Sequence, residues 1–327
     1  MSDESICQTQ NTAGELPLEA LRAEFRDHLQ ERAPLARYTS TRVGGPADVL
    51  VVVHTAAELE HAARTLWRMN LPMFILGGGS NVLVSDRGVR GVVVLNHARQ
   101  VHFDEKANPP GVWAESGASF GLISRQAAAR GLGGLEWAVG IPGTLGGAIV
   151  GNAGAHGADM AGSLVMAEIL HRLDMEQDMP SRSQTWTPKQ MEYTYRSSMI
   201  KRHPGEFVVL SALLRLERPS DGDVDAIQAR IDRFTEHRRS TQPQGASMGS
   251  IFKNPPGDFA GRLVDAAGLK GTRVGQAEIS TLHGNFFLNR GGAKAQDIYE
   301  LIRLARNTVF EKFGISLELE VELLGEW

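Results

Sequence analysis

Residues 140–157 read GIPGTLGGAIVGNAGAHG, and an earlier stretch, Leu76-Gly77-Gly78-Gly79-Ser80-Asn81, is also rich in glycine. The longer stretch holds seven glycines in eighteen residues. Glycine loses more backbone entropy on folding than other residues, so such a cluster weakens a fold unless the backbone has a special task. The task that these stretches favour is close approach to a large anionic ligand, with N–H groups facing phosphate oxygens.

Each stretch also has a plainer interpretation. The first lacks the spacing of a dinucleotide fingerprint and the lysine of a P-loop, and the strand-like Val82-Leu83-Val84 follows it, so a simple hairpin explains it equally well. The second is also compatible with tight helix packing around residues 148–151. The occurrence of two such loops in one chain favours a ligand cradle.

Composition places the chain among ordinary globular proteins. It has 327 residues, 42% of them hydrophobic and 22% charged, with a net charge of −4, so nothing indicates a nucleic-acid or membrane partner. Cys7 is the only cysteine and no H-E-x-x-H motif is present, so we expect neither an internal disulfide nor a metal site. The chain lacks a signal-peptide layout and a membrane-length apolar run, which predicts a cytoplasmic protein.

Strands and helices alternate irregularly, which predicts an α+β fold. Hydrophobic periodicity and turn residues predict strands at 47–53, 73–76, 82–84, 91–95, 111–115, 164–173, 207–216 and 315–323. Helices are expected at 18–29, 55–69, 119–131, 223–239 and 296–313. Residues 1–14 are polar and expected to be disordered, and Pro219-Ser220-Asp221-Gly222 predicts a domain boundary.

Three further segments carry polar side chains that could take part in catalysis. Their sequence pattern alone does not distinguish them from ordinary surface residues. Tyr195-Arg196 lies among hydroxyl residues, and Ser250 precedes Lys253 and Asn254 in a segment that ends in proline. In the last strand, the glutamates at 318, 320 and 322 alternate with apolar residues, so periodicity predicts that all three face solvent. His283 is more typical of a structural histidine than of a catalyst.

In their order and spacing, the segments 38–47, 76–83, 140–157, 195–196, 249–255, 260–280 and 319–321 resemble the UDP-N-acetylenolpyruvoylglucosamine reductase (MurB) family, in its shorter type. The resemblance extends over nearly all of residues 35–325. It implies an FAD-binding domain of the vanillyl-alcohol-oxidase (PCMH) type at 35–218, after a tail and short helix at 1–34, and an α+β substrate domain at 219–327. It also implies FAD and NADPH as cofactors, a UDP-sugar substrate of peptidoglycan synthesis, and no obligate protein partner.

The resemblance implies a role for each matching residue. Hydride would pass from flavin N5 to the vinyl CH₂ carbon of the substrate, Arg196 would hold the substrate carboxylate, and Ser250 would deliver a proton. Glu320 would assist the enolate and should have a pKa raised by burial, which reverses the solvent-facing interpretation. The substrate contacts would be Tyr195, Lys253 and Asn254. The FAD contacts would be Arg42, Gly77, Gly78, Gly79, Ser80, Asn81, Val82, Gly140, Ile141, Pro142, Gly143, Thr144, Gly146, Gly147, Asn152, Ala153 and Gly154.

The chain departs from the family pattern at a few positions. His156 stands where the family usually has tyrosine, Gly284 and Phe287 differ from the usual residues, and residues 174–187 are atypically polar. A sugar or alcohol oxidase on the same flavin fold is the alternative enzyme, and a non-catalytic nucleotide-binding protein is a third possibility.

Overall fold

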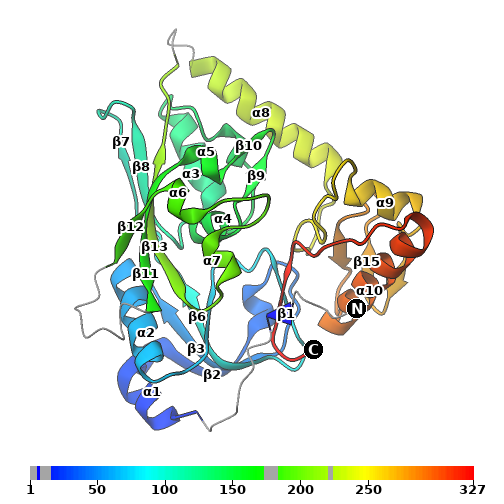
Figure 1. Ribbon diagram of the computed structural model, residues 1–327, viewed down its shortest axis with the longest axis horizontal. Coiled ribbons are helices and arrows are strands. Elements are labelled where there is room, and N and C mark those ends of the chain that lie inside the picture. The colour runs from blue at the N-terminus through cyan, green and yellow to red at the C-terminus, as the bar shows by residue number, and fades with distance from the viewer. Residues whose placement is uncertain (1–5, 8–15, 173–182, 220–223) are drawn as a thin grey trace.

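The computed structural model describes residues 6–7, 16–172, 183–219 and 224–327, and it confirms an α+β architecture (Figure 1). Two sheets with their helices form an N-terminal body, seen on the left of the view. The helices α9 (Ala260–Ala266) and α10 (Ala295–Phe313) and their small sheet form a C-terminal body on the right. The long helix α8 (Val224–Thr241) runs from the first body toward the second (Figure 1).

A four-stranded sheet positions the first glycine-rich loop. Its strands, in spatial order, are β2 (Leu29–Pro34), β3 (Pro46–Val53), β6 (Val89–Asn96) and β4 (Met73–Leu76). The last three are parallel, and β2 is an antiparallel edge strand. Helix α2 (Ala56–Arg68) packs its apolar face onto this sheet and begins at Thr55, whose hydroxyl accepts the Glu58 N–H. The loop at 77–81 therefore leaves the carboxyl end of β4.

The first predicted helix is shorter than expected. Helix α1 (Leu18–Phe25) ends where Arg26 adopts a φ of 44°, and a short 3₁₀ turn η1 (Arg26–His28) follows. Leu29, predicted as the last apolar residue of the helix, instead starts β2 and pairs with Val51. The prediction was wrong at Leu29 because apolar residues of a helix and of a following strand can pack into the same hydrophobic cluster, as Leu29 does here.

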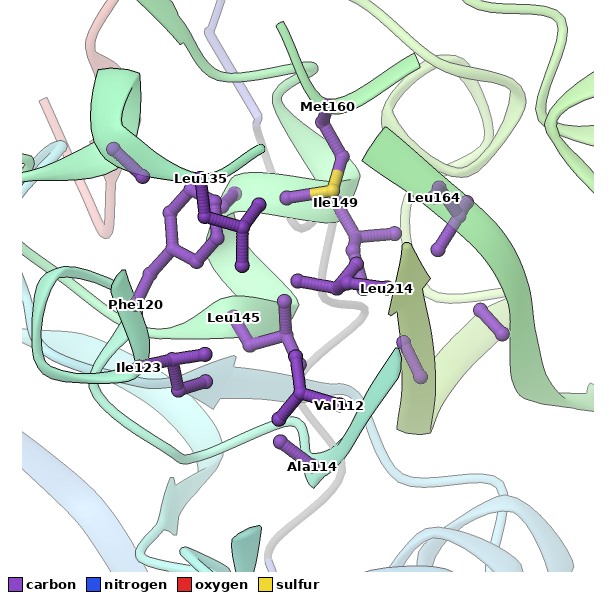
Figure 2. Packing of buried hydrophobic residues seen from close by; sticks show 14 of the residues in the cluster. Val112, Ala114, Phe120, Ile123, Leu135, Leu145, Ile149, Met160, Leu164 and Leu214 are labelled. Atoms are coloured by element: carbon purple, nitrogen blue, oxygen red, sulfur yellow. The ribbon is translucent and has the colours of Figure 1, made fainter. Parts of the chain in front are cut away.

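A five-stranded antiparallel sheet forms the other half of the N-terminal body. Its order is β12 (Gln184–Trp186), β11 (Leu164–His171), β13 (Phe207–Arg215), β8 (Gly111–Glu115) and β7 (Val101–Asp104). Its buried face packs against short helical segments, and Figure 2 shows Phe120, Ile123, Leu145 and Ile149 converging with Val112 and Leu214. These segments are α3 (Phe120–Ala129), η3 (Glu136–Ala138), α4 (Leu145–Val150), α5 (Met160–Ser163), α6 (Pro188–Met191) and α7 (Met199–Arg202), with the small hairpin β9 (Gly154–Ala155) and β10 (Ala158–Asp159). The short turn η2 (Leu35–Tyr38) packs instead against the four-stranded sheet.

The C-terminal body has its own core. It contains α9 (Ala260–Ala266), β14 (Arg273–Val274), β15 (Ala277–Ile279), β16 (Phe287–Asn289) and α10 (Ala295–Phe313). Gly314 ends α10 in the left-handed conformation, which glycine adopts more easily than other residues. Its hydrophobic cluster also takes in Val43 and Leu83 of the N-terminal body, so the two bodies share a packed boundary. The predicted linker residues 220–222 lie outside the described residues.

The chain end returns to the first glycine loop. β17 (Glu322–Leu324) pairs in parallel with β5 (Val82–Val84) on one side and with β1 (Ile6–Cys7) on the other. The predicted strand at 315–323 is wrong for most of its length because residues 315–321 lack a continuous ladder and make only an isolated bridge at Leu319. The expectation of disorder is wrong for residues 6–7, and residues 1–5 and 8–14 lie outside the described residues.

The other predicted elements are confirmed within a few residues, including α2, α3, β3 to β6, β8, β13 and α10. β11 ends at His171 where the prediction continued to residue 173, which is outside the described residues, and α8 extends to Thr241 instead of 239. The atypical segment 174–187 is described only from residue 183 onward.

Candidate active site

The two glycine loops meet in the structure. A Cβ atom added at Gly78 would lie 2.9 Å from the Cα of Gly143, and one added at Gly77 would collide with the Thr144 hydroxyl. The Ser80 hydroxyl donates a hydrogen bond of 3.2 Å to the Pro142 carbonyl. Larger residues at 77, 78 or 143 would force the loops apart, so the lack of side chains here serves loop-to-loop contact.

Several backbone donors at this junction have no protein acceptor. Within the described residues, the N–H groups of Gly78, Ser80 and Asn81 donate no hydrogen bond, and neither do those of Gly140, Gly143 and Thr144. Gly78 and Gly140 are exposed, and the other four residues are half-buried. Half-buried N–H groups rarely stay unpaired in native proteins. These donors therefore suit an anionic group such as a phosphate.

The second loop contains the short helix α4 as well as the free backbone donors. Thr144 caps α4, accepting the Gly147 N–H at 3.4 Å, while Ala148 and Ile149 are buried in the N-terminal core. A Cβ at Gly146 would lie 3.0 Å from the Ser116 carbonyl oxygen. The burial of Ala148 and Ile149 agrees with the plainer interpretation of tight helix packing around 148–151, which coexists with the free donors before it.

The end of the second loop supports Arg196 directly. The Asn152 amide donates to the Thr194 carbonyl at 3.0 Å, and its oxygen accepts the Ala161 N–H at 3.1 Å. The Arg196 Nη2 donates to the Gly154 carbonyl at 2.8 Å. Asn152 and Gly154, both predicted as FAD contacts, thus hold the arginine-bearing turn through the Asn152 amide and the Gly154 carbonyl.

Arg196 sits at the tip of a very tight turn. Thr194 and Ser197 exchange two backbone hydrogen bonds of 3.1 Å, which leaves Tyr195 and Arg196 as the central residues. Arg196 has a φ of 57°, a left-handed conformation that costs a non-glycine residue about 1 kcal/mol or more. Tyr195 is 54% exposed, and the Arg196 guanidinium lies 5.4 Å from its ring centroid. This conformation aims Arg196 inward while Tyr195 stays accessible.

Glu320 pairs with Arg196 across the boundary between the two bodies. Arg196 Nε and Glu320 Oε1 are 2.9 Å apart, and their side chains are 22% and 19% exposed. Burial raises the pKa of the Glu320 carboxyl, while the charges of Arg196, Lys201 and Lys253 oppose that rise. The expectation of a raised pKa at this position agrees with that direction.

The other two glutamates of the terminal segment differ from Glu320. Glu318 is 74% exposed and lies 3.2 Å from Lys253 Nζ, whereas Glu322 is 35% exposed and lies 3.5 Å from Lys201 Nζ. The periodicity-based prediction that all three face solvent is right for Glu318 and wrong for Glu320. The error arises because the Glu320 backbone is hydrogen-bonded to both bodies, through Ile251 and Asn81, so this position has no solvent-facing side.

Backbone hydrogen bonds bring Ser250 to the same place. The Glu320 N–H donates to the Ile251 carbonyl at 2.9 Å, and the Asn81 amide donates to the Glu320 carbonyl at 3.1 Å. Asn81 thereby ties the first glycine loop to Glu320. Ser250 is half-buried, and its hydroxyl makes no hydrogen bond to another described residue. The free hydroxyl of Ser250 thus lies one residue from Ile251, whose carbonyl holds the Glu320 backbone.

Asn285 fixes the Ser250 segment and was not singled out by sequence. It is 3% exposed, its oxygen accepts the Phe252 N–H at 2.9 Å, and its amide donates to the Phe252 carbonyl at 2.8 Å. His283 Nδ1 in turn accepts the Asn285 N–H at 3.1 Å, which fits the structural role expected of that histidine. No spacing in the sequence links positions 33 residues apart, so pattern reasoning had no signal for this clamp.

The predicted substrate contacts have different surroundings. Lys253 is held at the boundary by Glu318, whereas the Asn254 oxygen accepts the Ala260 N–H at 3.0 Å at the start of α9. Asn254 therefore has a structural task in the fold. Arg42 is exposed with a φ of 56°, two residues from Ser40, whose N–H donates to the Gly79 carbonyl at 2.9 Å. The segment that carries Arg42 therefore lies against the first loop.

A cavity of about 280 Å³ lies on the five-stranded sheet, lined by residues that include Trp113, Met166, Glu168 and Leu213, and no predicted site residue lines it. Among the described residues, no group of three or more His, Cys, Asp or Glu side chains could hold a metal ion. In the same part of the chain, no helix has the length and apolar character needed to span a membrane.

Comparisons with known proteins match both parts of the chain. Residues 47–175 match the model of an FAD-binding domain, and residues 242–324 match the model of the UDP-N-acetylenolpyruvoylglucosamine reductase C-terminal domain. The UDP-N-acetylenolpyruvoylglucosamine reductase of Chloroflexus aggregans is 43% identical over 299 residues, covering 90% of this chain and 97% of the relative. That of Bacillus subtilis is 39% identical over 294 residues, covering 89% and 92%.

A solved structure agrees with these sequence matches. The crystal structure of UDP-N-acetylenolpyruvylglucosamine reductase (MurB) from Thermus caldophilus superposes with a TM-score of 0.74 at 37% identity, covering 90% of this chain and 99% of that one. The fold, the FAD-binding match and the full-length relatives point the same way. The chain belongs to the UDP-N-acetylenolpyruvoylglucosamine reductase family of flavoprotein oxidoreductases.

Proposed function

We propose that this protein reduces UDP-N-acetyl-enolpyruvoylglucosamine to UDP-N-acetylmuramate in peptidoglycan precursor synthesis, with NADPH as the reductant. Family membership supports the reaction class. The observation that carries the proposal is the Arg196–Glu320 pair, formed beside Ser250 where the N-terminal and C-terminal bodies meet. A cation, a carboxyl of raised pKa and a free hydroxyl are the groups that reduction of an enolpyruvyl double bond requires.

The junction of the glycine loops fits FAD. Backbone N–H groups without protein acceptors can bind its pyrophosphate, and the missing side chains let the backbone approach the ligand. The residues proposed to hold it are those of the 77–82 and 140–147 loops. When bound and reduced by NADPH, FAD supplies the hydride that adds to the terminal vinyl carbon of the substrate.

Arg196 is proposed to bind the substrate carboxylate. Its Nη2 is fixed by the Gly154 carbonyl and its Nε faces Glu320, so the guanidinium is oriented before substrate arrives. Negative charge grows on the carboxylate as the vinyl carbon is reduced. A preoriented cation stabilises that charge without reorganisation, and one such interaction is typically worth about 3 kcal/mol.

Glu320 and Ser250 complete the proposed chemistry. A protonated Glu320 donates a hydrogen bond to the enolate oxygen, and the burial that raises its pKa favours this form. The Ser250 hydroxyl delivers a proton to the carbon that bears the carboxylate, which completes addition of one hydride and one proton across the double bond. Serine then recovers its proton from solvent. Serine is a weak acid, so its placement by the Asn285 clamp matters.

The test combines a spectrum with an activity assay. Purified protein should show flavin absorption and should oxidise NADPH in step with loss of the enolpyruvyl sugar nucleotide, giving a product heavier by two hydrogens. The matched control is the same assay with UDP-N-acetylglucosamine, which lacks the double bond and should give no NADPH oxidation beyond background. Protein that cannot be reconstituted with FAD, or that reduces no enolpyruvyl substrate, would refute the proposal.

A further inference from the structure

Arg238, near the end of α8, lies directly against the second glycine loop. A Cβ atom at Gly140 would be 3.1 Å from Arg238 Cδ and 3.2 Å from Nε. Gly140 has a φ of 72°, so its conformation also disfavours a side chain. The missing side chain at 140 leaves the room that the arginine occupies.

The charge of Arg238 has no counter-ion in the described part of the chain. No carboxylate there lies within ion-pair distance of its guanidinium, and no side-chain or backbone oxygen accepts a hydrogen bond from it. Burial lowers the pKa of Arg238 below the ordinary arginine value, which reflects the loss of water around the group. A desolvated cation is unfavourable unless it is paired, so this position calls for an anion.

The neighbouring titratable groups are cationic or basic. The His156 ring stacks on Phe234 of α8 with centroids 4.0 Å apart and an angle of 9° between planes, and the His237 ring lies 5.6 Å away. Burial lowers the pKa of His156, and Arg238, His237 and Arg233 add to that effect. The stack attaches the hairpin of the second loop to α8, which holds Arg238 in place without neutralising it.

The free backbone donors identify the kind of anion. Gly140, against which Arg238 lies, is followed within four residues by Gly143 and Thr144, and the N–H groups of all three have no acceptor among the described residues. Gly143 also touches the first glycine loop at Gly78. A planar guanidinium beside a row of backbone N–H groups matches phosphate oxygens, which it can bind through two parallel hydrogen bonds.

We propose that Arg238 binds a pyrophosphate group at the junction of the two glycine loops. This rests on the proposed function, whose cofactor FAD and UDP-sugar substrate both carry a pyrophosphate. The geometry assigns the chemistry, and experiment distinguishes the two sources. Arg238 thereby adds a ligand from α8, an element beyond the glycine-rich sequence.

The direct test is Arg238→Met, which keeps an unbranched apolar stem like that of arginine and removes the charged guanidinium. The matched control is Arg239→Met, one residue further along α8 and exposed. Deflavinated protein is titrated with FAD and followed by flavin fluorescence, and flavin-loaded protein is titrated with UDP and followed by flavin absorbance. We expect Arg238→Met to weaken one of the two affinities about tenfold or more, and Arg239→Met to stay within about twofold of wild type.

The pattern of loss assigns the source. Weaker FAD binding assigns Arg238 to the cofactor pyrophosphate, and normal FAD binding with weaker UDP binding assigns it to the substrate pyrophosphate. Unchanged affinity for both would overturn the proposal. Arg238→Lys should recover part of the lost affinity because it restores the charge but not the planar fork.

A probe without a nucleotide separates this proposal from the reaction. Inorganic pyrophosphate should raise the melting temperature of deflavinated wild-type protein and of Arg239→Met, but not that of Arg238→Met. Equal stabilisation of all three proteins would contradict a role for Arg238. Failure of the wild type to reduce the enolpyruvyl substrate, with these binding results intact, would refute the proposed reaction alone.

Discussion

The glycine loops and the terminal segment at 318–322 reach the same site in opposite ways. The loops act through their backbone. Their glycines let them touch one another at Gly78 and Gly143, and their N–H groups are free to bind a ligand. The terminal segment contributes one side chain, Glu320, from a run in which alternate glutamates look equivalent. A site built from backbone N–H groups can therefore be recognised from the glycine content of the sequence. A site built from side chains depends on which residues pack around them.

The largest expected effect belongs to the side-chain part of the site. Ser250→Ala should lower the rate of enolpyruvyl reduction about a thousandfold, because it removes the proposed proton donor. Reduction of the flavin by NADPH should continue at nearly the wild-type rate, since that half-reaction needs no proton from serine. Stopped-flow absorbance separates the two half-reactions. Equal loss in both would show that the serine has another role.

The glutamate run offers a comparison within one segment. Glu320→Gln should lower kcat about tenfold or more, because an amide is a far weaker acid than a protonated carboxyl and therefore a weaker hydrogen-bond donor to the enolate oxygen. Glu318→Gln, at the exposed position two residues earlier, should change kcat by less than about twofold. Steady-state kinetics of both variants checks this. Similar losses at both positions would mean that burial does not distinguish them.

Adding one methyl group at Gly78 tests how tightly the two glycine loops pack against each other. Gly78→Ala places a Cβ 2.9 Å from the Gly143 Cα, so the loops must separate, at a cost of about 1–3 kcal/mol in unfolding free energy and with weaker FAD binding. Gly162→Ala is the control, because its Cβ would meet only the Asp159 carboxylate at an ordinary 3.8 Å. Thermal unfolding and FAD titration measure both. A Gly78→Ala protein as stable as Gly162→Ala would show that the junction is loose.

The smallest effect concerns the proton on Glu320. The protonated form is the active one in the proposed reaction, so kcat should fall as pH rises through the pKa of Glu320. Lys201 lowers that pKa, and Lys201→Met should therefore move the falling limb of the pH profile to higher pH. The exposed Lys189→Met is the control and should leave the limb in place. A shift to lower pH would contradict the assigned protonation state.

Local sequence patterns predicted the regular elements well and the site only in part. Strands such as β3 and helices such as α10 follow from periodicity and caps, because those signals depend on neighbours in the chain. Leu29 was misassigned because burial alone does not tell a helix from a strand. The role of Asn152 in holding the Thr194 carbonyl became evident only when segments 42 residues apart met.

The sequence by itself determined the two glycine loops, the α+β class and, through the resemblance of ordered motifs, the family. It could do so because glycine content, periodicity and motif order are properties of the chain alone. Only the tertiary structure decided that Glu320 pairs with Arg196, that Asn285 clamps the Ser250 segment, and that Arg238 lies without a counter-ion against Gly140. Burial and charge pairing are set by residues far away in sequence, so no local pattern records them.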